Sequence, residues 1–303
     1  MLIALLTLIG LAIGAYGSLL IRAALRQRAR PGLEALGLGA VVNFFDALGI
    51  GSFATTTAWF KFRNMVPDRL IPQTMLCGLT PPAMAQSLIY LVAFSGQLDP
   101  VLLFSCVIAV FLGGLAGVPL VTRARVWVVQ ATVATGLLLA AAAYVMQGTG
   151  IFPHGGTANS LPVGVAVVAV LANFIFGFLA NFGVGNYAPT LVMFSLMGMD
   201  PRLAFPIMAG GAALMGAGSS FQHVRIGQVD LKVVLGLAIG GIPAVFVAVY
   251  LVKSMPLDYL RWLVVVVVLY AAAVMAHAAI RGRREHKAES ATALLASELE
   301  AGA

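Results

Sequence analysis

The sequence predicts an all-α polytopic membrane protein, and three observations support this: the composition, the spacing of the charges and an internal repeat. Of the 303 residues, 61% are apolar and 10% are charged, and the mean hydropathy is +0.99. A soluble domain has about 45–50% apolar and about 25% charged residues. So few charges cannot cover a soluble surface, and the same figures exclude a disordered chain and a coiled coil.

The net charge of +7 and the pI of about 9.8 would indicate nucleic-acid binding in a soluble protein. Here the cations form short clusters between apolar runs, as in cytoplasmic loops, and no basic and aromatic stripe is present. Cys77 and Cys106 lie inside apolar runs without metal-ligand spacing, which is typical of small core residues. We expect no nucleic-acid partner, no metal and no cofactor.

Uncharged stretches predict the membrane-spanning helices, because crossing the hydrocarbon layer takes about 20 apolar residues. They cover residues 1–21, 70–98, 100–122, 203–224, 233–252 and 262–280, and at least two segments, separated by a loop at 152–156, lie between 126 and 199. Basic residues follow the first run rather than precede it, which favours an uncleaved anchor with its N-terminus outside. Residues 282–303 are polar and are expected to form a cytoplasmic tail.

An internal repeat divides the chain into two related halves. Residues 45–54 resemble residues 179–188, so that Gly49 and Gly51 match Gly183 and Gly185. Weaker matches follow in the same order. The predicted organisation is an N-terminal transmembrane helix with a basic loop (1–30), a first repeat (31–150), a second repeat (151–281) and the tail (282–303).

The paired glycine breaks allow two interpretations. Glycine interruptions at corresponding positions of two halves indicate a transporter's substrate site, whereas glycines also allow close packing of membrane helices. Asp46 and Ser52 flank the first break and Asn181 and Asn186 the second, which is more polar than packing requires.

The basic residues indicate how the broken segments lie in the membrane. If each broken segment crossed once, Lys and Arg would be divided almost evenly between the two sides. If each turns back at its glycines, all but Arg202, Lys253 and Arg261 of the 18 Lys and Arg lie inside, as the positive-inside rule prefers. This arrangement predicts seven crossings and two re-entrant hairpins, with the N-terminus outside and the C-terminus in the cytoplasm. Each repeat then has three transmembrane helices and one hairpin, so the repeats are inverted, and the hairpin tips meet near the bilayer midplane.

A half-helix begins after each break, and its free N–H groups and dipole favour an anion. No Arg or Lys lies within either motif, so neutral donors would bind the anion loosely, as transport requires. Asp46 is an intramembrane acid, and the sequence leaves open whether it takes up a coupling proton or caps the neighbouring half-helix. The candidate substrate-binding residues are Asn43, Asp46, Gly49, Gly51, Ser52, Thr55, Thr56, Asn181, Gly183, Gly185, Asn186, Tyr187 and Thr190.

Three segments carry a resemblance to a known family. Residues 43–57, followed by residues 67–72, resemble the first signature of the sulfite exporter TauE/SafE family, and residues 177–189 are similar to its second signature. The resemblance implies a bacterial inner-membrane permease for sulfur-containing anions such as sulfite, organosulfonates or thiosulfate. Family members that handle thiosulfate through thiols need cysteines in the path, and Cys77 and Cys106 lie outside the matched signatures.

The sequence therefore predicts a secondary transporter, an exporter of small sulfur-containing oxyanions, in the cell inner membrane. A passive anion channel on the same scaffold is the alternative. No catalytic motif is visible, so we do not expect an enzyme. The partners are the lipid bilayer and a small anion, and the sequence leaves open whether the chain forms a homodimer.

Overall fold

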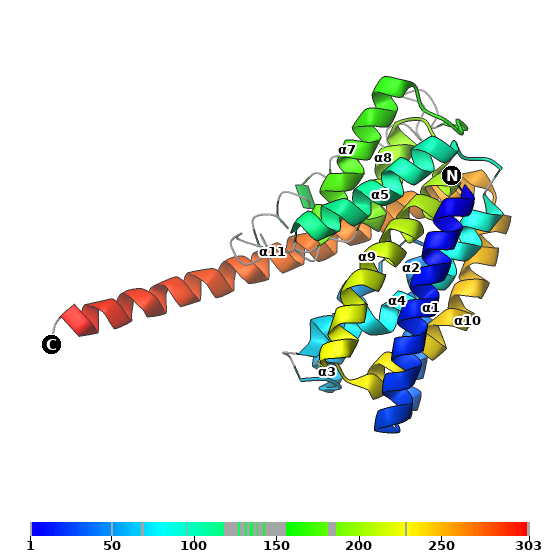
Figure 1. Ribbon diagram of the computed structural model, residues 1–303. Coiled ribbons are helices and arrows are strands. Elements are labelled where there is room, and N and C mark those ends of the chain that lie inside the picture. Colours follow the sequence, from blue (N-terminus) through cyan, green and yellow to red (C-terminus); the bar gives the residue numbers. More distant parts are fainter. Residues whose placement is uncertain are drawn as a thin grey trace.

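The computed structural model describes residues 2–49, 51–67, 70–94, 96–117, 127, 131, 134–135, 138, 142, 156–180, 186–227 and 229–301. Within these residues the fold is helical, and the one extended pairing is an isolated bridge between Ala158 and Met199 (Figure 1). The helices are α1 (Leu2–Gln27), α2 (Leu33–Ala47), α3 (Phe53–Arg63), α4 (Ile71–Ala93), α5 (Pro100–Gly117), α7 (Val163–Ala180), α8 (Tyr187–Leu196), α9 (Ala204–Ile226), α10 (Leu231–Ser254) and α11 (Leu257–Ala301), with a 3₁₀ turn at Pro201–Leu203.

Seven of the described helical segments are long and apolar enough to cross a membrane, which confirms a multi-pass helical protein. Six of them correspond to the predicted spans. The seventh is α7, which the sequence analysis placed in a hairpin. Of the crossing expected near residues 126–150, the structure describes residues 127, 131, 134–135, 138 and 142. The expected tail continues α11 as a helix to Ala301. At 45 residues, α11 is about 67 Å long, and it extends well beyond the rest of the molecule (Figure 1).

The first glycine break reverses the chain. Gly49 and Gly51 have φ angles of +95° and +81°, which glycine adopts without the strain that a Cβ would cause. Arg63, at the end of α3, forms a 2.8 Å ion pair with Glu34, at the start of α2. The start of α2 and the end of α3, which are the two ends farthest from the glycine break, therefore lie together. Helices α2 and α3 form an antiparallel hairpin.

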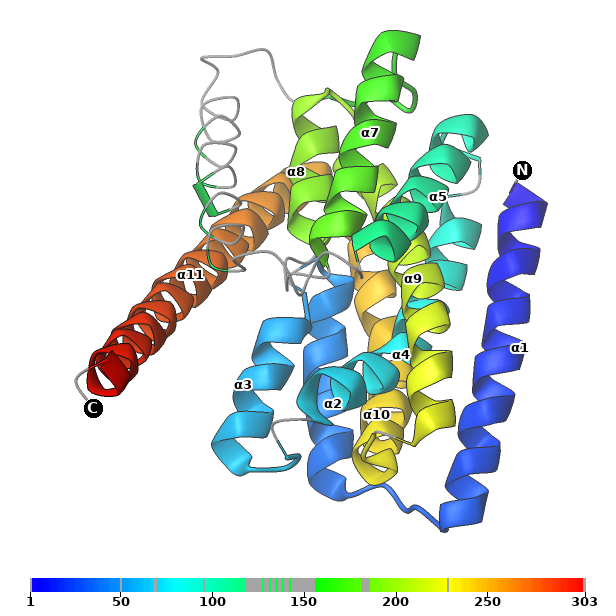
Figure 2. The same cartoon turned by 60° about the vertical axis from the view of Figure 1, so that its left-hand side comes forward.

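The two helices of the second broken segment, α7 and α8, also have their outer ends together. The chain just before α7 pairs with the chain just after α8: the Ala158 amide donates to the Gly198 carbonyl at 3.2 Å, and the Asp200 amide donates to the Ala158 carbonyl at 3.1 Å. Helices α7 and α8 thus also run antiparallel. Figure 2 shows the two pairs of helices approaching from opposite ends of the molecule, with the inner ends of α2 and α3 close to those of α7 and α8 in the middle.

Each hairpin packs against a helix from the other half of the chain. Helix α2 packs mainly on α10, α7 packs on α5, and α4 packs on α9. Glycines bring the first two pairs into close contact. A Cβ at Gly240 of α10 would overlap the backbone of Leu36, and one at Gly177 of α7 would overlap the backbone of Val110. Gly236 and Gly240 form a G-x-x-x-G pattern, which permits such an approach.

Helix α1 forms a hydrogen bond to α4 at a backbone carbonyl that has no partner within α4, because a proline lies four residues later. Pro81 lies inside α4 and has no N–H, so the Cys77 carbonyl lacks its helical partner. The Tyr16 hydroxyl of α1 donates to this carbonyl at 2.8 Å. Both cysteines are fully buried, as expected of core residues.

The hairpin geometry brings basic residues to one end of the molecule. The α1–α2 connection carries Arg28 and Arg30, and Glu34 just beyond it pairs with Arg63 of α3. Arg225 and Lys232 flank the α9–α10 connection, where the Asp230 amide donates to the Thr74 hydroxyl near the start of α4. Arg202 lies at the other end, where its guanidinium donates to the Met255 carbonyl at 2.6 Å.

Candidate functional site

Asp46 closes the tip of the first hairpin. One oxygen of its carboxylate accepts hydrogen bonds from the backbone amide and the hydroxyl of Ser52, both at 2.8 Å. Ser52 is the N-cap residue of α3, so the bonds join the end of α2 to the start of α3 across the two glycines. This contact lies at the N-terminus of α3, but the amide that Asp46 accepts is that of the N-cap residue itself and not one of the first helical turn. Both roles that the sequence left open for Asp46 stay predictions.

The described start of α8 differs from the start of α3. Asn186 is the N-cap residue of α8, and no side chain caps the first turn of that helix in the described structure. The Asn186 side-chain amide donates to the Met208 carbonyl of α9 at 3.4 Å. In the described part of the chain, no carboxylate accepts the backbone amides at the start of α8, where the positive end of the helix dipole lies.

A cavity of about 370 Å³ lies between the two tips. Asp46, Gly51 and Ser52 from the first hairpin and Asn186 and Tyr187 from the second line the same space. Faces of α4, α9 and α11 complete its walls. The described residues that line it include no Lys, Arg or His, so the lining carries the charge of one carboxylate and a set of neutral donors.

The structure places the predicted site residues in three groups. Asp46, Gly51, Ser52, Asn186 and Tyr187 line the cavity. Asn181, Gly183 and Gly185 lie outside the described residues. The others are near the tips but do not line the cavity: Asn43, Gly49, Thr55, Thr56 and Thr190.

Local hydrogen bonds and packing explain why this last group lies elsewhere. The Asn43 amide donates to the Gly39 carbonyl of its own helix at 2.8 Å. The Thr55 and Thr56 hydroxyls both donate to the Ser52 carbonyl. Thr190 is fully buried and donates to Asn173 of α7. Hydroxyls in a helix commonly form such bonds to the preceding turn.

A buried polar cluster behind Tyr187 was not identified from the sequence. The Tyr187 hydroxyl lies next to Asp46 and Gln86. Within the described residues, this hydroxyl, both amide atoms of Gln86 and the Ser87 hydroxyl have no hydrogen-bond partner. Buried polar groups without a partner are rare and are commonly satisfied by water or by a ligand. Gln86 and Ser87 lie in the middle of an apolar span, and no sequence signal showed that they face the hairpin tips.

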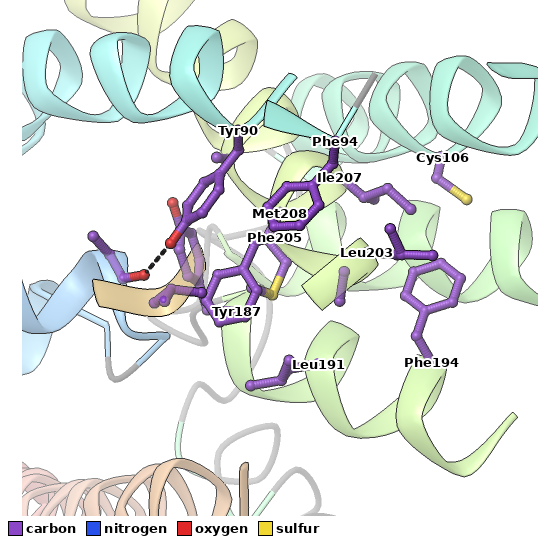
Figure 3. Close-up of a cluster of buried hydrophobic side chains, with 14 of the residues drawn as sticks. Tyr90, Phe94, Cys106, Tyr187, Leu191, Phe194, Leu203, Phe205, Ile207 and Met208 are labelled. Carbon is purple, nitrogen blue, oxygen red and sulfur yellow. Dashed lines mark hydrogen bonds between the residues drawn. The ribbon is translucent and has the colours of Figure 1, made fainter. Parts of the chain in front are cut away.

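Aromatic side chains hold this cluster in place. The Tyr90 hydroxyl donates to the Ala47 carbonyl at 2.7 Å, which ties α4 to the end of α2. The Tyr90 ring lies 5.1 Å from the Phe205 ring and 6.0 Å from the Phe94 ring, centroid to centroid. Figure 3 shows these rings together, with Tyr187 beside Phe205. The tips of both hairpins therefore rest on a packed core.

A multi-pass helical membrane protein with a cavity between two broken hairpins has the architecture of a membrane transport protein. Residues 165–302 match the family model described as sulfite exporter TauE/SafE. The match confirms the family resemblance in the second half of the chain, where it includes residues 177–189 and α8; residues 43–57 and 67–72 lie outside it. No curated protein and no solved structure matches the chain.

Proposed function

We propose that this protein is a secondary transporter that exports small sulfur-containing oxyanions, such as sulfite or organosulfonates, across the cell inner membrane. The observation that carries the proposal is the shared cavity. The N-cap residues of α3 and α8, Ser52 and Asn186, line the same space between the opposed hairpins. The family match supports sulfur-anion transport. The hairpins are re-entrant in this proposal, and the two halves are inverted repeats.

The anion binds nearer to α8 than to α3 in this proposal. Asp46 already accepts the Ser52 amide at the start of α3, so its charge offsets the positive end of that helix. The first turn of α8 has no side-chain cap, and its N-cap residue is an amide donor. Asn186, Tyr187 and the backbone N–H groups of α8 would then bind the oxyanion.

Asp46 couples the anion to protons in this proposal. A buried carboxylate in the wall of the cavity repels a bound anion as long as it is ionised, and protonation removes that repulsion. Anion and proton would therefore bind together.

The basic end of the molecule faces the cytoplasm in this proposal, as the positive-inside rule requires. The N-terminus then lies outside and the C-terminus in the cytoplasm. Opposed hairpins offer a fixed binding site around which the two halves rock to give alternating access.

Sulfite flux into proteoliposomes tests the proposed binding site. The double variant Ser52→Ala and Asn186→Ala removes a hydroxyl and an amide from the lining, and neutral hydrogen bonds are each worth about 1 kcal/mol. We expect at least about tenfold weaker apparent affinity for sulfite. The control variant Ser18→Ala and Asn159→Ala removes the same two groups at exposed positions and should transport normally. Unchanged transport by the first variant would contradict the proposed site.

A further inference from the structure

The walls of the cavity are mainly apolar, in contrast to the polar residues that the two hairpins contribute to it. Along α4 the lining residues are Pro72, Met75, Leu76, Leu79, Thr80 and Ala83. Their spacing places them on one face of the helix. Helices α9 and α11 contribute similar faces, with Met215 and Met275 among their lining side chains.

The lined face of α4 also sets the length of the cavity. From Pro72 to Ala83 the helix rises about 16 Å. A volume of about 370 Å³ is within the range of sites for organic ligands, about 300–1,000 Å³. The space is therefore longer and larger than one inorganic oxyanion requires.

A bare inorganic dianion fits these walls poorly. It would lose much of its hydration beside methionine and leucine side chains, and the described walls offer few hydrogen bonds in return, from the hydroxyls of Thr80, Ser219 and Tyr270. The described lining has no cation to offset that loss. An anion with an apolar part gains instead, because that part leaves water for the wall while the oxyanion stays at the tip of α8.

We propose that the preferred substrate is an organic anion whose sulfonate group is joined to an apolar chain or ring. This inference rests on the anion site proposed above and specifies the class of its ligand. The charged group binds at Asn186 and Tyr187, and the apolar part lies along α4 and α11.

Binding of a homologous series to the full-length protein in nanodiscs tests the inference. The ligands are methanesulfonate, propanesulfonate and pentanesulfonate, with sulfite and sulfate for comparison. Burial of one methylene is worth about 0.8 kcal/mol, so Kd should fall about fourfold with each methylene added. Pentan-1-ol has the same chain without the charge and should bind far more weakly than pentanesulfonate.

A matched pair of variants locates the apolar part. Ala271 of α11 is half-buried and lines the cavity, whereas Ala273, two residues later, is exposed. We expect Ala271→Leu to weaken pentanesulfonate at least tenfold and to leave methanesulfonate unchanged. Ala273→Leu should alter neither. Ala83→Leu, on the α4 wall, should act like Ala271→Leu, and retained methanesulfonate binding shows that each variant is folded.

The outcomes separate this inference from the proposed function. If sulfite and sulfate bind but chain length has no effect on Kd, the inference is overturned and the anion site stands. If no anion binds, or if pentan-1-ol binds as tightly as pentanesulfonate, both fail. If Ala273→Leu matches Ala271→Leu, the apolar part does not lie in the cavity and the inference is also overturned.

Discussion

At the scale of single residues, the position of Asp46 governs the chemistry of the cavity. Asp46 is 7% exposed and lies near the C-terminal, negative end of α2. The titratable groups that face it are phenols, Tyr90 of α4 and Tyr187 of α8, and Tyr270 of α11 lines the same cavity. Because none of these supplies a positive charge, a bound anion would face an unbalanced carboxylate unless Asp46 takes up a proton.

Asp46→Asn tests this coupling with little risk to the fold, because the Asn side-chain oxygen can still accept from Ser52. We expect wild-type affinity for methanesulfonate, whose own charge is constant near neutral pH, to fall as pH rises. One linked proton gives a slope of at most about tenfold per pH unit. The variant should bind with constant affinity, close to the low-pH value of the wild type. The measurement is a binding titration between pH 5 and pH 8.

Asp99→Asn is the matched control for Asp46→Asn. Asp99 also accepts backbone amides at the start of a helix, those of Val101 and Leu102, but it does not line the cavity. The control should keep the pH dependence of the wild type. A pH dependence that survives in Asp46→Asn would assign the linked proton to another group.

At the scale of helices, glycines have two different tasks in this fold. Gly49 and Gly51 supply positive φ angles at a chain reversal, whereas Gly240 lets α10 approach the backbone of α2. The sequence analysis weighed close packing as the alternative for Gly49 and Gly51. The structure assigns close packing chiefly to other glycines, including Gly177 and Gly240, because those lie where two helices cross.

Gly240→Ala should lower the free energy of unfolding by about 1–3 kcal/mol, because the added Cβ overlaps the Leu36 backbone, which cannot rotate away as a side chain could. Gly37→Ala is the matched control, since a Cβ there meets nothing within 4 Å. It should leave stability unchanged or raise it by up to about 1 kcal/mol. Thermal unfolding in detergent measures both. Equal stability of the two variants would mean that α2 and α10 are less closely packed than described.

At the scale of the whole molecule, the proposed topology depends on the two antiparallel hairpins, which bring the outer ends of their helices together. If α3 crossed the membrane, Lys61 and Arg63 would lie on the side opposite the start of α2. The ion pair between Arg63 and Glu34 instead holds both ends of the hairpin together. Helices α7 and α8 are also antiparallel, and this second hairpin enters from the opposite end of the molecule (Figure 2).

Cysteine labelling in intact cells tests this arrangement. Single cysteines replace the exposed residues Lys61, Arg225 and Lys253 in a chain that carries Cys77→Ala and Cys106→Ala. An impermeant thiol reagent should label the Lys253→Cys variant from outside. The Lys61→Cys and Arg225→Cys variants should react after the membrane is opened. Labelling of Lys61→Cys from outside would show that α3 crosses the membrane, and the proposal of opposed re-entrant hairpins would fail.

The sequence by itself determined the helical membrane class, most spans and the positions of the first glycine break and Ser52, because apolar length and glycine φ preferences are local properties. Tertiary structure decided which side chains face the cavity. Ser52 and Thr56 are one helical turn apart, yet Ser52 lines the cavity and Thr56 donates to the Ser52 carbonyl. Met75 and Leu79 look like any lipid-facing residues in the sequence. They line the cavity because this face of α4 packs toward α9 and α11. Which face of a helix is turned inward depends on the helices that pack around it.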